Sequence, residues 1–487
     1  MKRLANFYAL FLNLMGACFA LPLVTALIYG EGSSVRAFAL VMIACFATGG
    51  IVHFAKREDL SDMEMKPRET YFIVASTWII ASAIGCVPYI LTGSIPGFFD
   101  AFFETCSGFT TTGATVIDDV EALPRSVLLW RSLTQWLGGM GIIVLFVALL
   151  PHFGIKARNI ASAETPGPTV TKLTSRFTGT AQRLYIAYII LTAALALMLM
   201  GGSLSLYDAV NHAFATMATG GFSTYGDSIA HFDSDYITWV ITVFMFLAGT
   251  NFELFFVAVQ GHPLRALKNE EFGIYVKIIA VSVAAVAASL MIKGGYASLY
   301  RAVRDSAFQV ITIMTTTGYA TVDFDLWPVF CKMILIILMF IGGSSSSTAG
   351  GVKVIRVIVL FKMIKREINI KLHGNIVNDI SIGEQKVLSG TVTHIIAFVT
   401  LYLITLAAGT FLISIAGCGD IVTNFTAVLS CISNVGPGFG GVGPVCTYSF
   451  YDSFSTAVLS LVMVAGRLEL STFFILFSRF FWDPNRV

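Results

Sequence analysis

The stretch Thr315-Thr316-Thr317-Gly318-Tyr319-Ala320 decides the fold, because related stretches occur at three other places in the chain. They read TTTGAT at residues 110–115, TGGFS at residues 219–223 and, more loosely, SNVGPG at residues 433–438. Each follows a short amphipathic segment and is followed by a polar or acidic loop. Such self-similarity indicates a chain built from four copies of one structural unit.

A glycine at the centre of each copy sets the register of this repeat. Gly113, Gly221, Gly318 and Gly436 are separated by 108, 97 and 118 residues. In the first three copies an aspartate stands thirteen residues before the glycine, and this favours Gly221 over its neighbour Gly220. Each interval has room for two spanning helices and one short helix that enters the membrane and turns back.

The composition points to a protein that lies in a lipid bilayer. Hydrophobic residues make up 56% of the chain and charged residues 12%, whereas about a quarter of the residues of soluble domains are charged. Five apolar stretches have the length of about 20 residues that a membrane crossing needs. They are Leu184–Gly202, Trp239–Gln260, Ile274–Ile292, Val392–Ile415 and Ser455–Phe477. We therefore expect an all-α polytopic membrane protein.

The expected organisation is an N-terminal hairpin of two helices and four helix, pore-loop, helix repeats with pseudo-fourfold symmetry around one pore. The hairpin covers residues 1–60, and the repeats cover residues 69–152, 181–261, 271–371 and 388–482. This gives ten crossings, if every unit has two full spans. Basic clusters recur in alternate connections, so the positive-inside rule places them and both termini in the cytoplasm. The opposite connections are acidic or neutral, as at Asp118, Asp227 and Asp323.

Several partner and cofactor classes are not indicated. A net charge of +2 without a basic patch gives no reason to expect a nucleic-acid partner. Eight scattered cysteines indicate neither a zinc site nor a disulfide framework. The chain has no phosphate-loop motif, no HExxH motif and no large soluble domain, so we do not expect an enzyme or an ATP-driven pump.

The glycine-centred turns suit a small monovalent cation. Irregular backbone at membrane depth is tolerated where it lines a watery cavity, and glycine lets carbonyl oxygens point into that cavity. Rings of carbonyl oxygens replace the hydration shell of K⁺ in potassium filters, and the C-terminal ends of the short helices add negative potential. Small residues also permit close packing of membrane helices, but four occurrences favour a pore. The predicted filter residues are Thr111, Thr112, Gly113, Gly220, Gly221, Phe222, Thr317, Gly318, Tyr319, Asn434, Val435 and Gly436.

A polar run interrupts the second span of the third unit and is a candidate gate. It comprises Gly342, Gly343, Ser344, Ser345, Ser346, Ser347, Thr348, Ala349, Gly350 and Gly351. Glycine disfavours a helix by about 1 kcal/mol per position, although a kinked helix or a cytoplasmic linker is the alternative. Arg467 lies inside an apolar stretch and is either an electrostatic barrier in the pore or the partner of a carboxylate such as Glu469. Glu104, Lys277 and Glu253 are read as structural.

These motifs together resemble the Trk/Ktr/HKT superfamily of potassium transporters. The resemblance rests on TTTGAT, TTTGYAT, GGSSSSTAGGVKVIR (342–356), SNVGPGFG and GRLE (466–469), and the hairpin and GRLE look like its TrkH branch. It implies potassium uptake across the bacterial inner membrane by a homodimer that binds no cofactor itself. It also implies a cytosolic partner of the TrkA type that binds the nucleotide, either ATP/ADP or NAD. The family's filter glycines carry over onto Gly113, Gly221, Gly318 and Gly436, its gate onto residues 342–351 and its pore arginine onto Arg467.

Selectivity and coupling remain open from the sequence. In this family a serine at the first filter glycine is associated with sodium permeation, so Gly113 favours potassium. The second and fourth turns lack the triple threonine. A secondary symporter driven by sodium or protons is the alternative, since such proteins also have repeats and broken helices. The stretch 362–386 is either a docking surface for the partner or a solvated basic loop.

Overall fold

The structure is a computed structural model that describes residues 2–55, 67–141, 177–373, 379–383 and 385–482 of the 487-residue chain. These residues are almost entirely helical. Their strands are β1 (Ser381–Ile382) and β2 (Gln385–Lys386), which form one antiparallel pair. The expectation of an all-α polytopic membrane protein is confirmed.

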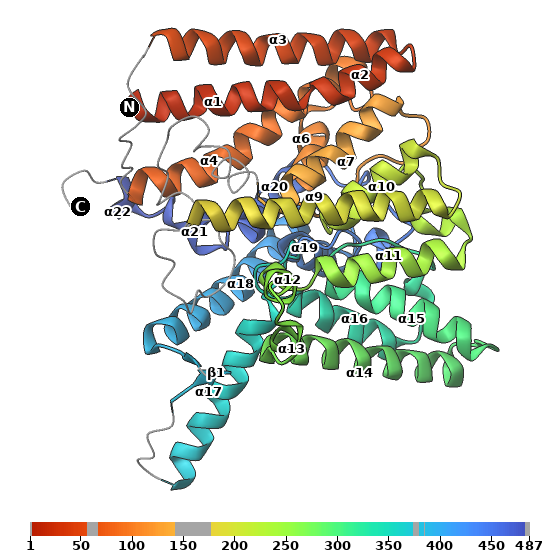
Figure 1. Cartoon of the computed structure of the whole chain (residues 1–487), viewed down its shortest axis with the longest axis vertical. Coiled ribbons are helices and arrows are strands. Elements are labelled where there is room, and N and C mark those ends of the chain that lie inside the picture. The colour runs from red at the N-terminus through yellow and green to blue at the C-terminus, as the bar shows by residue number, and fades with distance from the viewer. Residues whose placement is uncertain (1, 56–66, 142–176, 374–378, 384, 483–487) are drawn as a thin grey trace.

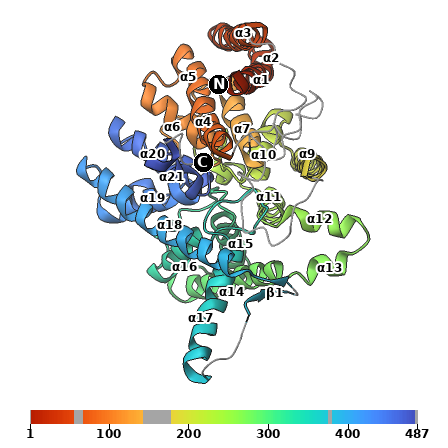
Figure 2. The same cartoon turned by 90° about the vertical axis from the view of Figure 1, so that its left-hand side faces the viewer.

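The chain begins with a helical hairpin that lies at one end of the molecule. It consists of α1 (Lys2–Cys18), α2 (Ala20–Ile28) and α3 (Gly32–Ala55). Figures 1 and 2 show α1 and α3 side by side at this end, while α17 projects from the opposite end. The start of α1 and the C-terminal helix α22 lie on the same side of the molecule in Figure 1.

Four groups of helices follow, and each contains a long helix, a short helix with a turn, and a second helix. The first group is α4 (Pro67–Gly85), α5 (Val87–Thr92), α6 (Phe98–Phe109) and α7 (Arg125–Gly139). The second is α9 (Phe177–Gly201), α10 (Leu206–Met217), η4 (Ser228–Phe232), α11 (Asp235–Ala248), α12 (Phe252–Val259) and α13 (Pro263–Leu267).

The third and fourth groups repeat this order. The third is α14 (Glu270–Lys293), α15 (Leu299–Met314), η5 (Phe324–Leu326), α16 (Val329–Ile341) and α17 (Val354–His373). The fourth is α18 (Ser389–Ile415), α19 (Ile421–Ser433), η6 (Gly440–Val442), α20 (Ser453–Arg467), α21 (Ser471–Ile475) and α22 (Arg479–Trp482).

The helices that are long and apolar enough to cross a membrane have a regular place in this order. There are six among the described residues: two in the hairpin and the first long helix of each group. They expose large apolar side chains, such as Leu197, Val281 and Phe411, each 69% exposed. Exposed apolar side chains of this kind are suited to contact with lipid. The short helices α6, α10, α15 and α19 are instead largely buried between the long ones.

Two of the predicted spanning stretches are interrupted. The stretch Trp239–Gln260 was predicted as one span, but α11 and α12 meet at a bend of 92°. The stretch Ser455–Phe477 was also predicted as one span, but α20 ends at Arg467. Neither stretch is one continuous helix, because hydropathy does not register a break whose freed backbone groups bond to other parts of the protein. The described residues therefore contain six continuous spanning helices, or seven spans if the bent pair is counted as one. The expected total of ten crossings also counts a second span in residues 69–152, of which residues 142–152 lie outside the described residues, and it stays a prediction.

Two of the four short helices, α10 and α19, begin at a residue whose side chain caps them. Ser205 accepts a hydrogen bond from the backbone N–H of Asp208 at the start of α10, and Asp420 accepts one from Thr423 at the start of α19. The four short helices contain 12, 12, 16 and 13 residues. At 1.5 Å per residue they end within the thickness of a bilayer. The turns that follow them are thus held inside the protein.

Candidate functional site

The turns that follow the four short helices share one backbone conformation. The central glycine has a φ of 83° at Gly113, 78° at Gly221, 83° at Gly318 and 102° at Gly436. The residue two positions earlier also has positive φ: 56° at Thr111, 54° at Thr219, 55° at Thr316 and 57° at Asn434. The same alternation in all four copies places Gly221, rather than Gly220, in register with the other three glycines.

Three of these left-handed residues are threonines, which are poorly suited to that conformation. A left-handed conformation costs an L-residue roughly 1–2 kcal/mol, and a β-branched residue there is an outlier. One hydrogen bond common to the four copies supports the turn, since the residue before the glycine donates its N–H to the carbonyl five residues earlier. The distances are 2.9 Å for Thr112, 2.8 Å for Gly220, 2.8 Å for Thr317 and 2.9 Å for Val435. Strain of this kind is typical of functional sites.

The four turns pack against one another in a closed ring, which we call the turn ring. A Cβ atom added to the glycine of one turn would meet the carbonyl oxygen of the residue before the glycine in the next turn. The distances are 2.2 Å from Gly113 to Gly220, 2.0 Å from Gly221 to Thr317, 2.0 Å from Gly318 to Val435 and 2.7 Å from Gly436 to Thr112. A side chain does not fit there, so each glycine permits a close approach of two backbones.

Several predicted filter residues contribute backbone atoms, rather than side chains, to the turn ring. The Tyr319 hydroxyl lies 3.4 Å from the carbonyl oxygens of His212 and Phe222. The Phe222 ring packs under the Arg131 guanidinium, 4.2 Å from the ring centroid. The hydroxyls of Thr315 and Thr317 lie 2.8 Å apart. These side chains support the turns. The ligands that coordinate K⁺ in potassium filters are carbonyl oxygens.

A buried glutamine braces the second turn and was missed by the sequence analysis. Gln135 of α7 donates from Nε2 to the carbonyl of Gly220 at 2.6 Å, and its Oε1 accepts from the N–H of Phe222 at 3.1 Å. The signal that could have found it is the spacing of Arg131 and Gln135, which are four residues apart and therefore lie on one face of α7.

The polar run of the third group forms a loop, here called the interrupting loop, from Gly342 to Lys353 between α16 and α17. The N–H of Gly350 donates to the Thr316 hydroxyl at 2.8 Å. A Cβ atom on Gly350 would lie 2.1 Å from the carbonyl oxygen of Ser433. The interrupting loop therefore packs directly against the third and fourth turns.

The interrupting loop is also bonded to the bend between α11 and α12. Ser344 donates its N–H to the carbonyl of Gly249 at 3.0 Å, and the Thr348 hydroxyl donates to the carbonyl of Ala248 at 3.1 Å. In return the N–H of Phe252 donates to the Ser346 carbonyl at 3.1 Å. These bonds satisfy the backbone groups that the bend removes from the helix.

A carboxylate from α14 holds the middle of the interrupting loop. Glu271 accepts hydrogen bonds from the N–H and from the hydroxyl of Ser345, both at 2.6 Å. Hydrogen bonds to a charged acceptor are roughly twice as strong as neutral ones. Glu271 is a further residue that the sequence analysis did not single out, because it stands at the start of a long helix, where an acidic residue is ordinary.

Arg467 joins the interrupting loop to the first group of helices. Its guanidinium donates to the carbonyls of Thr348 at 2.9 Å, Gly138 at 2.7 Å and Gly139 at 2.6 Å. Glu469, which was considered as its partner, forms an ion pair with Arg356. Since Thr348 also contacts Ala248, the ends of the second helices in the first, second and fourth groups meet at the interrupting loop.

The acidic loops that follow the turns are partly neutralised. Asp235 forms an ion pair with Arg304, and Asp325 forms one with Lys332 at 2.7 Å. Both pairs are partly exposed, and such pairs contribute little to stability. The net negative charge of these loops is therefore smaller than their count of acidic residues.

The architecture defines a class of polytopic membrane proteins in which re-entrant helices from one chain bring four backbone turns together. The family model described as "TrkH: Cation transport protein" matches residues 34–272 and 275–483. The Trk system potassium uptake protein TrkH of Escherichia coli (strain K12) is 34% identical over 99% of both chains. TrkH of Vibrio parahaemolyticus is 35% identical over 99% of both chains. The crystal structure of the potassium transporter TrkH from Vibrio parahaemolyticus matches with a TM-score of 0.88, at 32% identity over 99% of both chains.

This chain belongs to the TrkH family of cation transport proteins. The resemblance drawn from the sequence motifs is thereby confirmed, as is the expectation that the chain is not an enzyme. Membership of the family and the six spanning helices make it a multi-pass membrane protein.

Proposed function

We propose that this chain takes up K⁺ across a bacterial inner membrane through the turn ring. The single observation that carries the proposal is the closed contact of the four turns, in which each glycine lies against a carbonyl of the next turn. Rings of carbonyl oxygens can replace the hydration shell of a monovalent cation. The relatives named above are potassium uptake proteins, and this supports potassium as the ion.

The interrupting loop is the proposed gate. It contacts the turn ring through Gly350 and is tied to three groups of helices by Glu271, Thr348 and Arg467. Movement of this loop would have to break hydrogen bonds that are individually modest, about 1 kcal/mol each. Gly350→Ala, which pushes the loop away from Ser433, is expected to raise uptake without changing ion preference. Gly390→Ala, where a Cβ atom has open space, is the control.

Control by a cytosolic nucleotide-binding partner of the TrkA type, and assembly as a homodimer, complete the proposal. The support is α17, which projects from the molecule and exposes apolar side chains along its length. Phe361 and Leu372 are each 69% exposed. Leu372→Glu should weaken binding of the purified partner in the presence of ATP, ADP or NAD and leave basal uptake unchanged. Unaltered binding would place the contact elsewhere.

The experiment that tests the function is rubidium uptake by potassium-starved cells that carry the protein. A side chain at Gly113 meets the carbonyl of Gly220 at 2.2 Å, so Gly113→Ser is expected to let sodium compete with rubidium. Gly226→Ser is the matched control, since a Cβ atom there meets nothing within 4 Å. Equal ion preference in Gly113→Ser and the wild type would remove Gly113 from the pathway.

Currents in a planar bilayer separate a pore from a symporter. Unitary potassium currents are expected from the purified protein. Uptake that depends on a sodium or proton gradient and gives no unitary current would instead favour alternating access.

A further inference from the structure

A buried ion pair between Glu104 and Arg131 lies beside the turn ring. Glu104 of α6 is fully buried, and Arg131 of α7 is 2% exposed. The Nε and Nη2 atoms of Arg131 both lie 2.9 Å from Glu104 Oε1. Burial of two charges is costly unless their remaining hydrogen-bonding groups are also satisfied, so the other contacts of the pair show what it holds.

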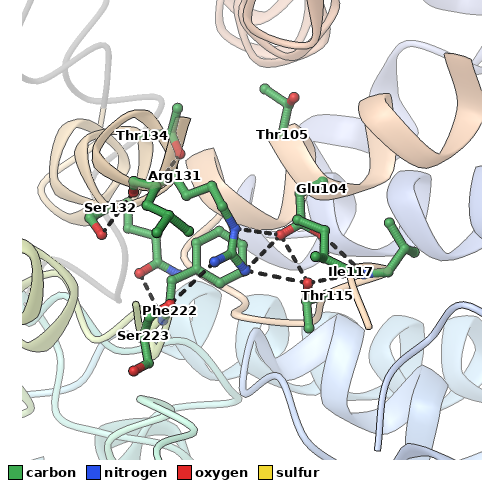
Figure 3. A network of polar contacts seen from close by, with 12 residues as sticks. Glu104, Thr105, Thr115, Ile117, Arg131, Ser132, Thr134, Phe222 and Ser223 are labelled. Carbon is green, nitrogen blue, oxygen red and sulfur yellow. Dashed lines mark hydrogen bonds and ion pairs between the residues drawn. The ribbon is translucent and has the colours of Figure 1, made fainter. Parts of the chain in front are cut away.

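The pair contacts the first and the second turn at equivalent positions (Figure 3). Thr115 and Ser223 each stand two residues after the central glycine of their turn. Glu104 accepts from the Thr115 hydroxyl at 3.0 Å, while Arg131 lies 3.3 Å from that hydroxyl and donates to the Ser223 carbonyl at 3.3 Å. The guanidinium also covers the Phe222 ring. One cation thus bridges two neighbouring turns.

The other turns show what is particular to this pair. The position nine residues before the glycine is Glu104 in the first copy, His212 in the second, Gln309 in the third and Ala427 in the fourth. His212 Nε2 lies 3.0 Å from the Ser223 hydroxyl, and Gln309 Nε2 lies 3.4 Å from the Thr321 hydroxyl. In those two copies the side chain contacts its own turn. In the first copy the carboxylate recruits an arginine that reaches the next turn.

We infer that Glu104 and Arg131 form a positioning pair that fixes the first turn relative to the second and thereby contributes to ion preference. The inference rests on the proposed function and names residues for it. Selectivity of a carbonyl ring depends on how its oxygens are spaced and held. Arginine suits this task because its planar group donates in several fixed directions, which a lysine cannot reproduce.

The test compares ion preference with stability in the purified protein. Rubidium uptake into vesicles is measured with and without competing sodium, and thermal unfolding is followed in detergent. Arg131→Lys keeps a positive charge beside Glu104 but loses the contacts to Ser223 and Phe222. We expect sodium competition to rise by about tenfold in this variant, with little change in the unfolding temperature.

A double variant separates positioning from folding. Glu104→Gln and Arg131→Met each leave one buried group without its charged partner and should lower the unfolding temperature. The combination Glu104→Gln/Arg131→Met should regain much of the unfolding temperature, yet keep the raised sodium competition, because the two turns are no longer bridged. Wild-type ion preference in Arg131→Lys and in the double variant would overturn the inference.

Two controls keep this outcome distinct from a failure of the proposed function. Arg304→Lys keeps a positive charge beside Asp235 and Asp305, in an ion-pair cluster outside the turn ring, and should change neither readout. If the wild-type protein itself gave no rubidium uptake, the proposed function would fail. If the wild type were selective and only the Glu104 and Arg131 variants were indistinguishable from it, the positioning role alone would fail.

Discussion

The first and third turns are braced by their own threonines. In the first, the Thr110 and Thr112 hydroxyls lie 2.8 Å apart, and Thr110 donates to the carbonyl of Cys106 at 2.7 Å. Thr315 and Thr317 repeat this arrangement in the third turn, with distances of 2.7 and 2.8 Å. The partners in these contacts lie within six residues along the chain, so the motif TTTG supplies part of its own support.

The second and fourth turns reach the same backbone conformation with other supports. The second turn has no hydroxyl at residues 218 and 220, and its brace is Gln135 from a different group of helices. In the fourth, the Gly436 carbonyl accepts from Ser430 Oγ at 2.7 Å and from the Tyr448 hydroxyl at 2.8 Å. The common feature is the position of the backbone, and the side chains that secure it are exchangeable.

The largest effect is expected at the two adjacent glycines of the second turn. Gly221 has positive φ, and a Cβ atom there would meet the carbonyl of Thr317 at 2.0 Å, whereas one on Gly220 would meet the Gln135 side chain. Gly221→Ala should abolish selective rubidium uptake, since both the conformation and the contact are lost. Gly220→Ala should retain part of it, because a side chain can move. Equal effects of the two substitutions would contradict the register deduced from the φ angles.

A smaller effect is expected when Gln135, which supports the second turn from another group of helices, is replaced. Gln135→Leu leaves the carbonyl of Gly220 and the N–H of Phe222 without this partner, which costs about 1–3 kcal/mol for each group that stays unsatisfied. The variant should unfold at a lower temperature and admit more sodium. Gln260→Leu, at an exposed position, is the control. A Gln135→Leu protein with wild-type melting and uptake would show that the second turn needs no external brace.

The smallest effect is expected when a threonine hydroxyl that supports its own turn is removed. Thr317→Val keeps the shape of the side chain and removes one hydroxyl pair, which costs about 0.5–1.5 kcal/mol. Thr112→Val should cost more, because Thr112 also accepts from the Asn434 amide at 3.0 Å. Thr393→Val, on an exposed face of α18, serves as the reference for melting temperature. An equal loss in Thr317→Val and Thr112→Val would mean that the contact with Asn434 contributes nothing.

The parts that the sequence predicted correctly are those with local causes. The apolar length of α9, α14 and α18 is visible in the sequence, and these helices cross without interruption. The run of glycines and serines that starts at Gly342 also breaks the helix where it was expected to, because α16 ends at Ile341. Hydropathy and glycine content act within one segment, so one segment is enough to read them.

The parts that the sequence did not predict depend on distant partners. Gln135 lies 85 residues from Gly220, and Glu271 lies 74 residues from Ser345. The bend after Ala248 is stabilised by Thr348, 100 residues away. A polar residue in a membrane helix signals that some partner exists, but its identity follows only from the packing of the repeats.

The turn ring also has a consequence for how such a protein can change. One polypeptide supplies all four turns, so the turns need not have the same sequence. A single substitution changes only one of the four turns. The hydrogen bond from Arg131 to Ser223 already distinguishes the contact between the first and second turns. In an assembly of four identical subunits, every substitution would change all four turns at once. Under the proposed function, ion preference could therefore be adjusted in small steps, with three of the four turns unchanged at each step.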